Sequence, residues 1–323
     1  MSDAKKIYRQ LAWPDAPLFH QPWWLDAVAG DAWDVCMVKD GEEMKAYFLY
    51  AIKNDLQGFQ IIMPMLTQFL GPNYKLKAQS ARKRLNEETE MLEALLHQLP
   101  AAAFFESRWH FHFQNWLPFY WKGFLQTTRY TYFLPDISNP ELLRENFSEK
   151  INREINKAEK QFSIEQASDV AAFYSLLVKN FSGKRMKIPF EKKLLQKIFD
   201  ACCLREAGKI WLAKDAAGKI AAGIFIVKDA ATAYYLIGGK DDDFGNSGAM
   251  SFLFWNCFRE LSRESSAEKE GARSFDFEGS MIKGVENYFR SFGAEQKGFF
   301  EITKIKSALL KMKSSVKSFL NRG

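Results

Sequence analysis

The sequence lacks the features that mark membrane-spanning, secreted and metal-binding chains. No apolar run approaches the roughly 18 residues that a membrane span requires, and the N-terminus has no apolar core of a secretory signal. The four cysteines form no CxxC pair, and the four histidines form no HExxH motif. We therefore expect a cytoplasmic protein with reduced thiols and no metal site.

The sequence also lacks a Walker loop, a GxSxG elbow and a broadly basic body. The net charge is +6, and the segment Ile302–Gly323 alone carries six Lys or Arg and no acid. The rest of the chain is therefore balanced in charge. A balanced body argues against a general nucleic-acid binder, because such binding depends on clustered Lys and Arg.

The basic segment Ile302–Gly323 has apolar residues at helical spacing, which predicts an amphipathic C-terminal helix with lysines on its other face. Two interpretations stay open. The helix docks on anionic lipid, giving a peripheral membrane contact, or on RNA. Alternatively it packs on the body and leaves its lysines in water, which we favour.

Aromatic residues are abundant, with 29 Phe and 9 Trp in 323 residues. At roughly 150 residues per domain, this length indicates two domains, and the rings supply a large core. The densest run, Trp109–Tyr132, suits stacking on bases or sugars, or burial in the core and a domain interface. We favour burial and expect a strand at Trp109–Phe113.

The predicted elements occur in the same order in each half of the chain. Helices precede a three-stranded meander, which is followed by a loop, a helix and further strands. This order predicts an α+β fold with two related domains, each a mixed, mostly antiparallel sheet flanked by helices. We place the domains at 1–140 and 141–301, and the C-terminal helix at 302–323.

The stretch Phe275–Gly293 carries the acids that best suit proton transfer. A short strand ending near Phe277 places Asp276 and Glu278 on one face, since strand side chains alternate. Together with Ser280, they could orient an amine or accept its proton. The alternative is that the acids cap the next helix or neutralise a basic neighbour, and for Asp276 the two interpretations have equal weight.

A glycine-containing loop joins a strand to a helix within Tyr234–Ser251. Gly245, Asn246 and Gly248 suit a turn that holds a pyrophosphate against backbone N–H groups and a helix N-terminus. The run Asp241–Asp243 precedes the turn directly, and three carboxylates would repel a pyrophosphate at close range. Coenzyme A binding is therefore open at this point.

Two basic segments could contact an anionic substrate. Arg153 and Lys157 share a face of the helix Lys150–Lys160, but acids lie among them and we favour a solvated face. Lys184 and Arg185 lie on a loop, where cations more often serve ligands. A loop kept soluble by its charge is an equal alternative.

Several of these stretches resemble the Fem-type, FemAB-like branch of the GNAT superfamily. The resemblance covers most of the chain and rests on HQPWWLDAVAG, LGP, NWLPFYWKGFLQTTRYTY, KINREINKAEK, YYLIGG and FDFEGSMIKGVENYFRSFGAE. It implies tandem GNAT-like domains and an acyltransferase. Fem-type members move an amino acid from aminoacyl-tRNA to the amino group of a peptidoglycan precursor peptide, and their relatives use acyl-CoA or acyl carriers.

The resemblance also implies roles for individual residues. Phe289 and Arg290 stand where the family has a Phe-Lys pair, and Lys184 or Arg185 matches its basic loop residue. Tyr235 matches a tyrosine on the last strand of the meander. On this basis we expect Glu278 to orient the amine or transfer its proton, Tyr235 to hydrogen-bond the reacting centre, and the cations to bind an anionic substrate.

The expected cosubstrate is acyl-CoA or aminoacyl-tRNA, with no permanently bound cofactor. The long helical hairpin that some Fem proteins use on tRNA is not evident, which weakens the tRNA donor. The expected acceptor is a small molecule or a peptide or glycan precursor of the cell envelope. The alternative is a non-catalytic binding protein that has lost its donor site. The sequence sets no oligomeric state.

Overall fold

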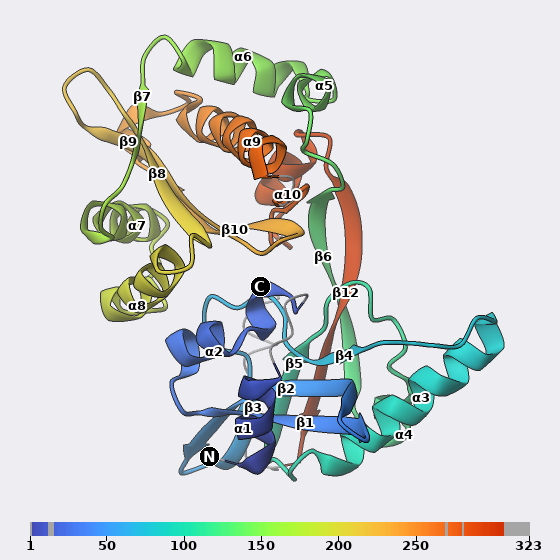
Figure 1. Cartoon of the computed structure of the whole chain (residues 1–323). Coiled ribbons are helices and arrows are strands. Elements are labelled where there is room, and N and C mark those ends of the chain that lie inside the picture. Colours follow the sequence, from blue (N-terminus) through green and yellow to red (C-terminus); the bar gives the residue numbers. More distant parts are fainter. Residues whose placement is uncertain (1, 12–15, 269–270, 280, 307–323) are drawn as a thin grey trace. The chain divides into compact units, whose positions relative to one another are not determined.

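The computed structural model describes residues 2–11, 16–268, 271–279 and 281–306 (Figure 1). These residues divide into two compact units. Unit 1 contains the described residues up to Arg129 and those from Gly298 onward, and unit 2 runs from Tyr130 to Lys297. The two strands β6 (Leu125–Leu134) and β12 (Glu295–Ile305) each include residues of both units.

Unit 1 contains a mixed sheet in the order β1-β2-β3-β5-β12, with β4 paired to β2. The first three strands form an antiparallel meander, β5 runs parallel to β3, and β12 runs antiparallel to β5. Besides β12, its elements are α1 (Asp3–Gln10), η1 (Leu18–His20), α2 (Pro22–Ala29), β1 (Trp33–Asp40), β2 (Glu43–Asp55), β3 (Gly58–Ile62), β4 (Pro72–Tyr74), α3 (Ala81–Gln98), β5 (Phe104–Arg108) and α4 (Leu117–Trp121).

Unit 2 repeats this arrangement in the order β7-β8-β9-β10-β11-β6. The meander is β8-β9-β10, β11 runs parallel to β10, and β6 runs antiparallel to β11. Besides β6, its elements are α5 (Pro140–Glu145), α6 (Glu149–Ala158), β7 (Ser163–Gln166), α7 (Ala171–Gly183), α8 (Lys192–Cys203), β8 (Gly208–Lys214), β9 (Ile220–Lys228), β10 (Thr232–Lys240), η2 (Asp242–Phe244), α9 (Ala249–Glu268), β11 (Ser274–Asp276) and α10 (Lys283–Arg290).

The last strand of each sheet is exchanged between the halves of the sequence. β6 follows the first half of the chain but pairs with β11, and β12 follows the second half but pairs with β5. The α+β fold with two related sheets is as the sequence predicts, whereas the exchange is not. The division of the chain at 140/141 and 301/302 stays a prediction.

Helices cover both faces of the unit 2 sheet, with α6 and α9 on one side and α7 and α8 on the other (Figure 1). α6 begins where the hydroxyl of Ser148 accepts a hydrogen bond from the N–H of Ile151, as an N-cap does. Ile151, Ile155 and Ala158 recur at helical spacing and are buried. The helix is therefore held over α9 by one apolar stripe.

Two expectations about local structure are wrong. Trp109–Phe113 is not a strand, because β5 ends at Arg108 and Trp109 turns into the core, where it is fully buried. Ile302–Ile305 lie in β12, so the expected C-terminal helix does not begin at Ile302. The remainder of that helix, 307–323, lies outside the described residues. Within the described ranges, no helix has the length and apolar character needed to cross a bilayer.

Candidate functional site

The two parallel strands of unit 2 pair over a short length and then separate. The pairing of β10 with β11 extends from Thr232 and Ser274 to Tyr234 and Asp276, whereas β10 continues to Lys240. A register shift lies within β10 between Tyr235 and Ile237. The second half of β10 is thus not paired with β11, and its side chains and backbone are available on that edge.

A cavity of about 400 Å³ lies along this edge of unit 2. Its walls come from β10, the loop that follows it, the start of α9, and one face each of α6, α7 and α10. The lining residues are Lys150, Glu154, Asn180, Lys184, Tyr235, Gly238, Gly239, Lys240, Gly245, Asn246, Ser247, Gly248, Ala249, Met250, Ser251, Gly284, Val285, Tyr288 and Phe289.

The loop between β10 and α9 is held against α6. Gly248 has a φ of 81°, and a Cβ atom there would overlap the backbone carbonyl of Glu154. The ammonium of Lys157 donates a hydrogen bond to the carbonyl of Asn246 at 3.2 Å. Because the first N–H groups of a helix have no intrahelical acceptor, this loop and the start of α9 form a place where an anion can bind. The expected residues Gly245, Asn246 and Gly248 all line it.

The run Asp241–Asp243 does not line the cavity, and its charge is offset. Lys179 lies 2.6 Å from the carboxylate of Asp241 and 2.7 Å from that of Asp243, and Lys219 lies 3.1 Å from Asp243. These cations lower the pKa of the Asp243 carboxyl. The expected repulsion of a pyrophosphate is therefore much weaker than three bare carboxylates would give.

Cations lie at the cavity instead, and one of them is Lys184. Its ammonium donates a hydrogen bond to the side-chain oxygen of Asn180 at 3.0 Å. Asn180 in turn donates to the carbonyl of Lys240 at 2.9 Å. Lys150 also lines the cavity, on α6. Lys240 lines it too, so three lysines surround an opening that suits a phosphate-bearing ligand.

Tyr235 and Phe289 form the aromatic wall of the cavity. The ring of Tyr235 packs edge-on against Phe254 at 5.0 Å and against Phe289 at 6.0 Å, measured between centroids. Its hydroxyl lies over Gly238, where a Cβ atom would come within 2.6 Å of it. Burial, with the nearby carboxyl of Glu278, raises the pKa of Tyr235 well above its ordinary value. The phenol is therefore neutral and can donate a hydrogen bond.

A second polar group at the cavity is not among the residues expected from the sequence. The hydroxyl of Ser251, on α9, donates to Glu154 at 2.6 Å and lies 2.9 Å from the hydroxyl of Tyr288. Burial raises the pKa of Tyr288, and the charge of Glu154 acts in the same direction. Glu154, Ser251 and Tyr288 are far apart in the chain, so no local motif joins them. The only sequence signal for Tyr288 is its place beside Phe289.

Asp276 is the last residue of β11, and Glu278 lies two residues further on. Asp276 is 2% exposed and accepts hydrogen bonds from the Thr131 hydroxyl and, at 2.7 Å, from the N–H of Glu278. Glu278 has a left-handed φ of 57°, and Gly279 follows with its Cα packed on the carbonyl of Tyr130. This strained turn sets the direction of the Glu278 side chain.

Both carboxyls have raised pKa values. Burial raises the pKa of Asp276 to about 6, and burial together with the charge of Asp276 raises the pKa of Glu278 well above its ordinary value. The Oε1 atom of Glu278 is buried and has no hydrogen-bond partner among the described residues. Of the two, Asp276 has a pKa at which a carboxyl exchanges a proton near neutral pH, and burial favours the neutral form of Glu278. Neither acid lines the cavity directly.

The other expected residues lie away from this cavity. Arg153 and Arg185 are exposed and do not line it. Arg290 is exposed on α10, where it forms an ion pair with Glu286 at 3.2 Å and donates to Asn287 at 2.6 Å. Ser280 lies outside the described residues. The cavity thus gathers Tyr235, Lys184, Phe289 and the glycine loop, but not these arginines.

Comparison with known proteins agrees with this geometry. Residues 145–290 match the family model of the acetyltransferase (GNAT) domain, a range that includes every residue lining the cavity. None of the curated proteins compared with the chain matches it in sequence.

Solved structures with the same fold cover almost the whole chain. The structure of FemX has a TM-score of 0.61 at 13% identity and covers 93% of this chain and 94% of its own. The C-terminal domain of a protein named as a lysylphosphatidylglycerol synthetase, from Agrobacterium fabrum, has a TM-score of 0.56 at 13% identity over 98% and 97%. A tandem GNAT protein of the clavulanic acid biosynthesis pathway has a TM-score of 0.50 at 11% identity over 93% of each chain. Residues 145–290 thus match the acetyltransferase (GNAT) domain, and the chain as a whole has the fold seen in FemX and in the tandem GNAT protein.

Proposed function

We propose that unit 2 transfers an acyl or aminoacyl group from an activated donor to an amine, in the metabolism of cell-envelope, polysaccharide or peptidoglycan precursors. The observation that carries this proposal is the cavity where β10 and β11 separate. It joins an anion-binding loop to a neutral tyrosine hydroxyl, with a protonatable carboxyl nearby. Transfer to an amine needs these three groups.

The donor is an acyl thioester of coenzyme A or an aminoacyl-tRNA, and both carry phosphate. The loop Gly245–Gly248, the start of α9 and the lysines around the opening fit a phosphate or pyrophosphate. The ion pairs of Asp241 and Asp243 remove the main objection to coenzyme A. A donor held there would direct its activated carbonyl toward the second half of β10.

In the reaction, the neutral amine nitrogen attacks the activated carbonyl carbon and a C–N bond forms. The C–S bond of a thioester, or the C–O bond of an aminoacyl ester, then breaks, and the leaving group takes up a proton while the nitrogen loses one. Tyr235 donates a hydrogen bond to the developing oxyanion or the leaving atom. Glu278 exchanges the proton through Tyr235, whose pKa it influences.

The acceptor class rests on relatives with the same fold. FemX and a lysylphosphatidylglycerol synthetase share it, and the latter name describes an amino acid joined to a lipid. A peptide or glycan precursor of the envelope fits the open side of the cavity, next to Lys184. Lys184 and Phe289 are then the substrate-binding residues that line the cavity.

The test compares three donors on the full chain. Acetyl-CoA, a long-chain acyl-CoA and an aminoacyl-tRNA are each added in thermal unfolding, and free thiol or deacylated tRNA is measured with a panel of amines. We expect one donor to raise the melting temperature and to react. The matched variant Lys184→Gln should weaken that donor or acceptor, whereas Lys192→Gln, on α8, should not. If none of the three donors binds, the chain is a non-catalytic scaffold and the proposal fails.

A further inference from the structure

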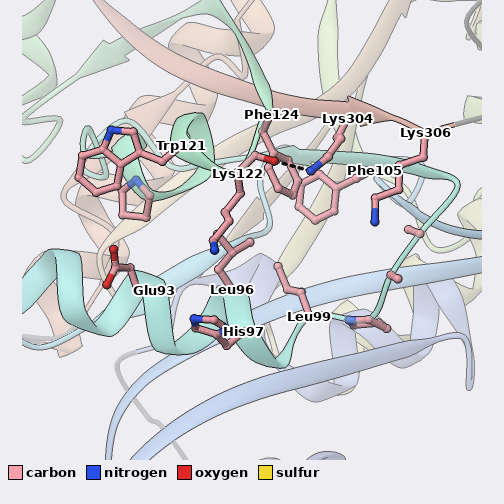
Figure 2. Close-up of a pocket in the computed structure, with 14 residues that line it drawn as sticks. Glu93, Leu96, His97, Leu99, Phe105, Trp121, Lys122, Phe124, Lys304 and Lys306 are labelled. Carbon is pink, nitrogen blue, oxygen red and sulfur yellow. Dashed lines mark hydrogen bonds between the residues drawn. The ribbon is translucent and has the colours of Figure 1, made fainter.

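A second cavity, of about 490 Å³, lies in unit 1 and has no part in the proposed reaction. Its apolar walls include Leu96 and Leu99 at the end of α3 and Phe105 and Phe124 from β5 and the segment after α4 (Figure 2). Three lysines, Lys122, Lys304 and Lys306, project around it. The cavity therefore combines hydrocarbon walls with a cationic rim.

Glu93 is the one acid among the described residues that line the cavity, against three lysines, so the lining carries a net positive charge. The ammonium of Lys304 donates to the carbonyl of Lys122 and lies 4.6 Å from the centroid of the Phe124 ring. Burial lowers the pKa of Lys304, and the charges of Lys306 and Lys122 lower it further. A bound anion would relieve this repulsion.

Large exposed apolar side chains stand beside the lysines. On α4, Leu117, Tyr120 and Trp121 are 47%, 58% and 59% exposed, while Phe119 is fully buried. Positions 117, 120 and 121 have the spacing that places residues on one helix face. Tyr and Trp have an apolar body and a polar tip, and they gather where protein meets the boundary between lipid and water.

We propose that unit 1 binds the surface of an anionic phospholipid bilayer through this patch. The α4 face (Leu117, Tyr120 and Trp121) enters the interfacial region, and Lys122, Lys304 and Lys306 contact head-group phosphates. The apolar walls of the cavity take the glycerol and upper acyl carbons of one lipid. Nucleic acid fits less well, because phosphate contacts make no use of an exposed leucine and the chain outside 302–323 is balanced in charge.

The contribution of the lysines to membrane binding is tested by vesicle flotation of the full chain. Vesicles of phosphatidylserine mixed with phosphatidylcholine are compared with vesicles of phosphatidylcholine alone. The variant Lys122→Gln/Lys306→Gln, which leaves the packed Lys304 in place, should bind the anionic vesicles about tenfold or more weakly. The control Lys192→Gln/Lys193→Gln removes the same charge from exposed positions on α8 and should stay within about twofold of the unmodified chain.

The contribution of the exposed aromatic side chains to membrane binding is tested by Tyr120→Ser/Trp121→Ser. The control is Leu204→Ser, because Leu204 is 79% exposed in unit 2. The first should lose about fivefold or more in binding, and the second should lose little. Equal binding by all variants, or equal losses in test and control pairs, would overturn the proposal. So would displacement from vesicles by soluble glycerol phosphate, which would mark a site for free phosphate. Losses in RNA binding with unchanged vesicle binding would assign the patch to nucleic acid instead.

Discussion

The two units have the same sheet topology but differ in the chain that follows the last strand of the meander. In unit 2, β10 continues past its partner β11, and a glycine loop leads from it into α9. In unit 1, β3 ends at Ile62, and the chain that follows turns back onto the end of β5. There Leu70 donates to the carbonyl of Arg108 at 2.8 Å and accepts from the hydroxyl of Ser107 at 2.8 Å.

We propose that this difference is the reason why the donor binds in unit 2 and not in unit 1. In unit 1, a Cβ atom on Gly71 would lie 2.6 Å from the Trp109 ring, so this ring packs directly against the chain that follows β3. Unit 1 has one cavity at the C-terminal end of α3, with lysines on its rim, and a further one at the N-terminal end of α3, beside Tyr74 and Phe113. Under the proposed function, one copy of the repeated fold carries the reaction site, and the other copy can contact a different partner.

The contrast between the two units depends most on the Glu278 carboxyl of unit 2, so its removal should have the largest effect. Glu278→Gln removes the protonatable group but keeps the side-chain length, and we expect turnover to fall about 100-fold or more with little change in substrate affinity. The measurement is the pH profile of kcat and kcat/KM with the donor that reacts. Glu165→Gln, an exposed acid of unit 2, serves as the control. Full activity of Glu278→Gln over the whole profile would refute the assignment.

The glycine loop gives a sharper contrast, because two of its glycines differ in surroundings. Gly248→Ala places a methyl group against the carbonyl of Glu154 at a positive φ, and we expect a loss of about 2–4 kcal/mol in stability together with donor binding. Gly245 also has a positive φ, 53°, but nothing lies within 4 Å of its added Cβ. Gly245→Ala should therefore cost only about 1 kcal/mol. Denaturant unfolding and acetyl-CoA titration of both variants measure the difference.

The pH dependence of unit 2 gives a third test, through Asp276. Its pKa in the folded chain is raised from 3.8 to about 6, so the folded state holds a proton that the unfolded state has lost. Stability therefore decreases as pH rises from about 4 to 6, by at most about 3 kcal/mol for a shift of two pH units. Asp276→Asn keeps an acceptor for Thr131 and removes this decrease.

The readout is the free energy of unfolding of both proteins at pH 5 and pH 8. The gain of Asp276→Asn over the unmodified chain should be larger at pH 8. An equal difference at the two pH values would show that Asp276 is ionised without penalty, contrary to its burial.

Patterns along the sequence predicted the order of elements in both units and the loop Gly245–Gly248, because local spacing and glycine carry that information. They did not predict the exchange of β6 and β12, since strand pairing depends on contacts far apart in the chain. Trp109 shows the same limit: alternation over Trp109–Phe113 suggests a strand, but burial of its ring against Gly71 bends the chain instead.

The site shows where charge can mislead. The run Asp241–Asp243 suggests repulsion, yet Lys179 and Lys219 reach it from other elements. Arg290 looks like a substrate residue beside Phe289, but helical spacing lets it pair with Glu286 on its own helix. Tyr288 has no distinguishing motif, and its hydrogen bond with Ser251 is seen only in the folded chain. Contacts between side chains of different helices and strands are thus the feature of the candidate site that a single sequence does not predict.

The smallest expected effect concerns unit 1, where a partly buried acid, Glu301, has a pH dependence of stability opposite to that of Asp276. Burial acts to raise the pKa of Glu301, but Arg129, which donates to it at 2.6 Å and 3.0 Å, and Arg108, at 3.1 Å, lower it below its ordinary value. Its contribution to stability is therefore present above about pH 4.5 and is lost as pH falls through the lowered value. Glu301→Gln should cost about 1–2 kcal/mol at pH 7 and progressively less below pH ~4.

The control is Glu165→Gln, which breaks an ion pair of similar length, 2.6 Å, on an exposed surface where such pairs contribute at most about 0.5–1 kcal/mol. Unfolding of both variants is followed from pH 7 down to acid. If Glu301→Gln is no more destabilising than Glu165→Gln, or if its cost does not shrink in acid, the arginine pair does not stabilise the join of β5, β6 and β12. The different pH dependence of stability at Asp276 and Glu301 would then be due to burial alone.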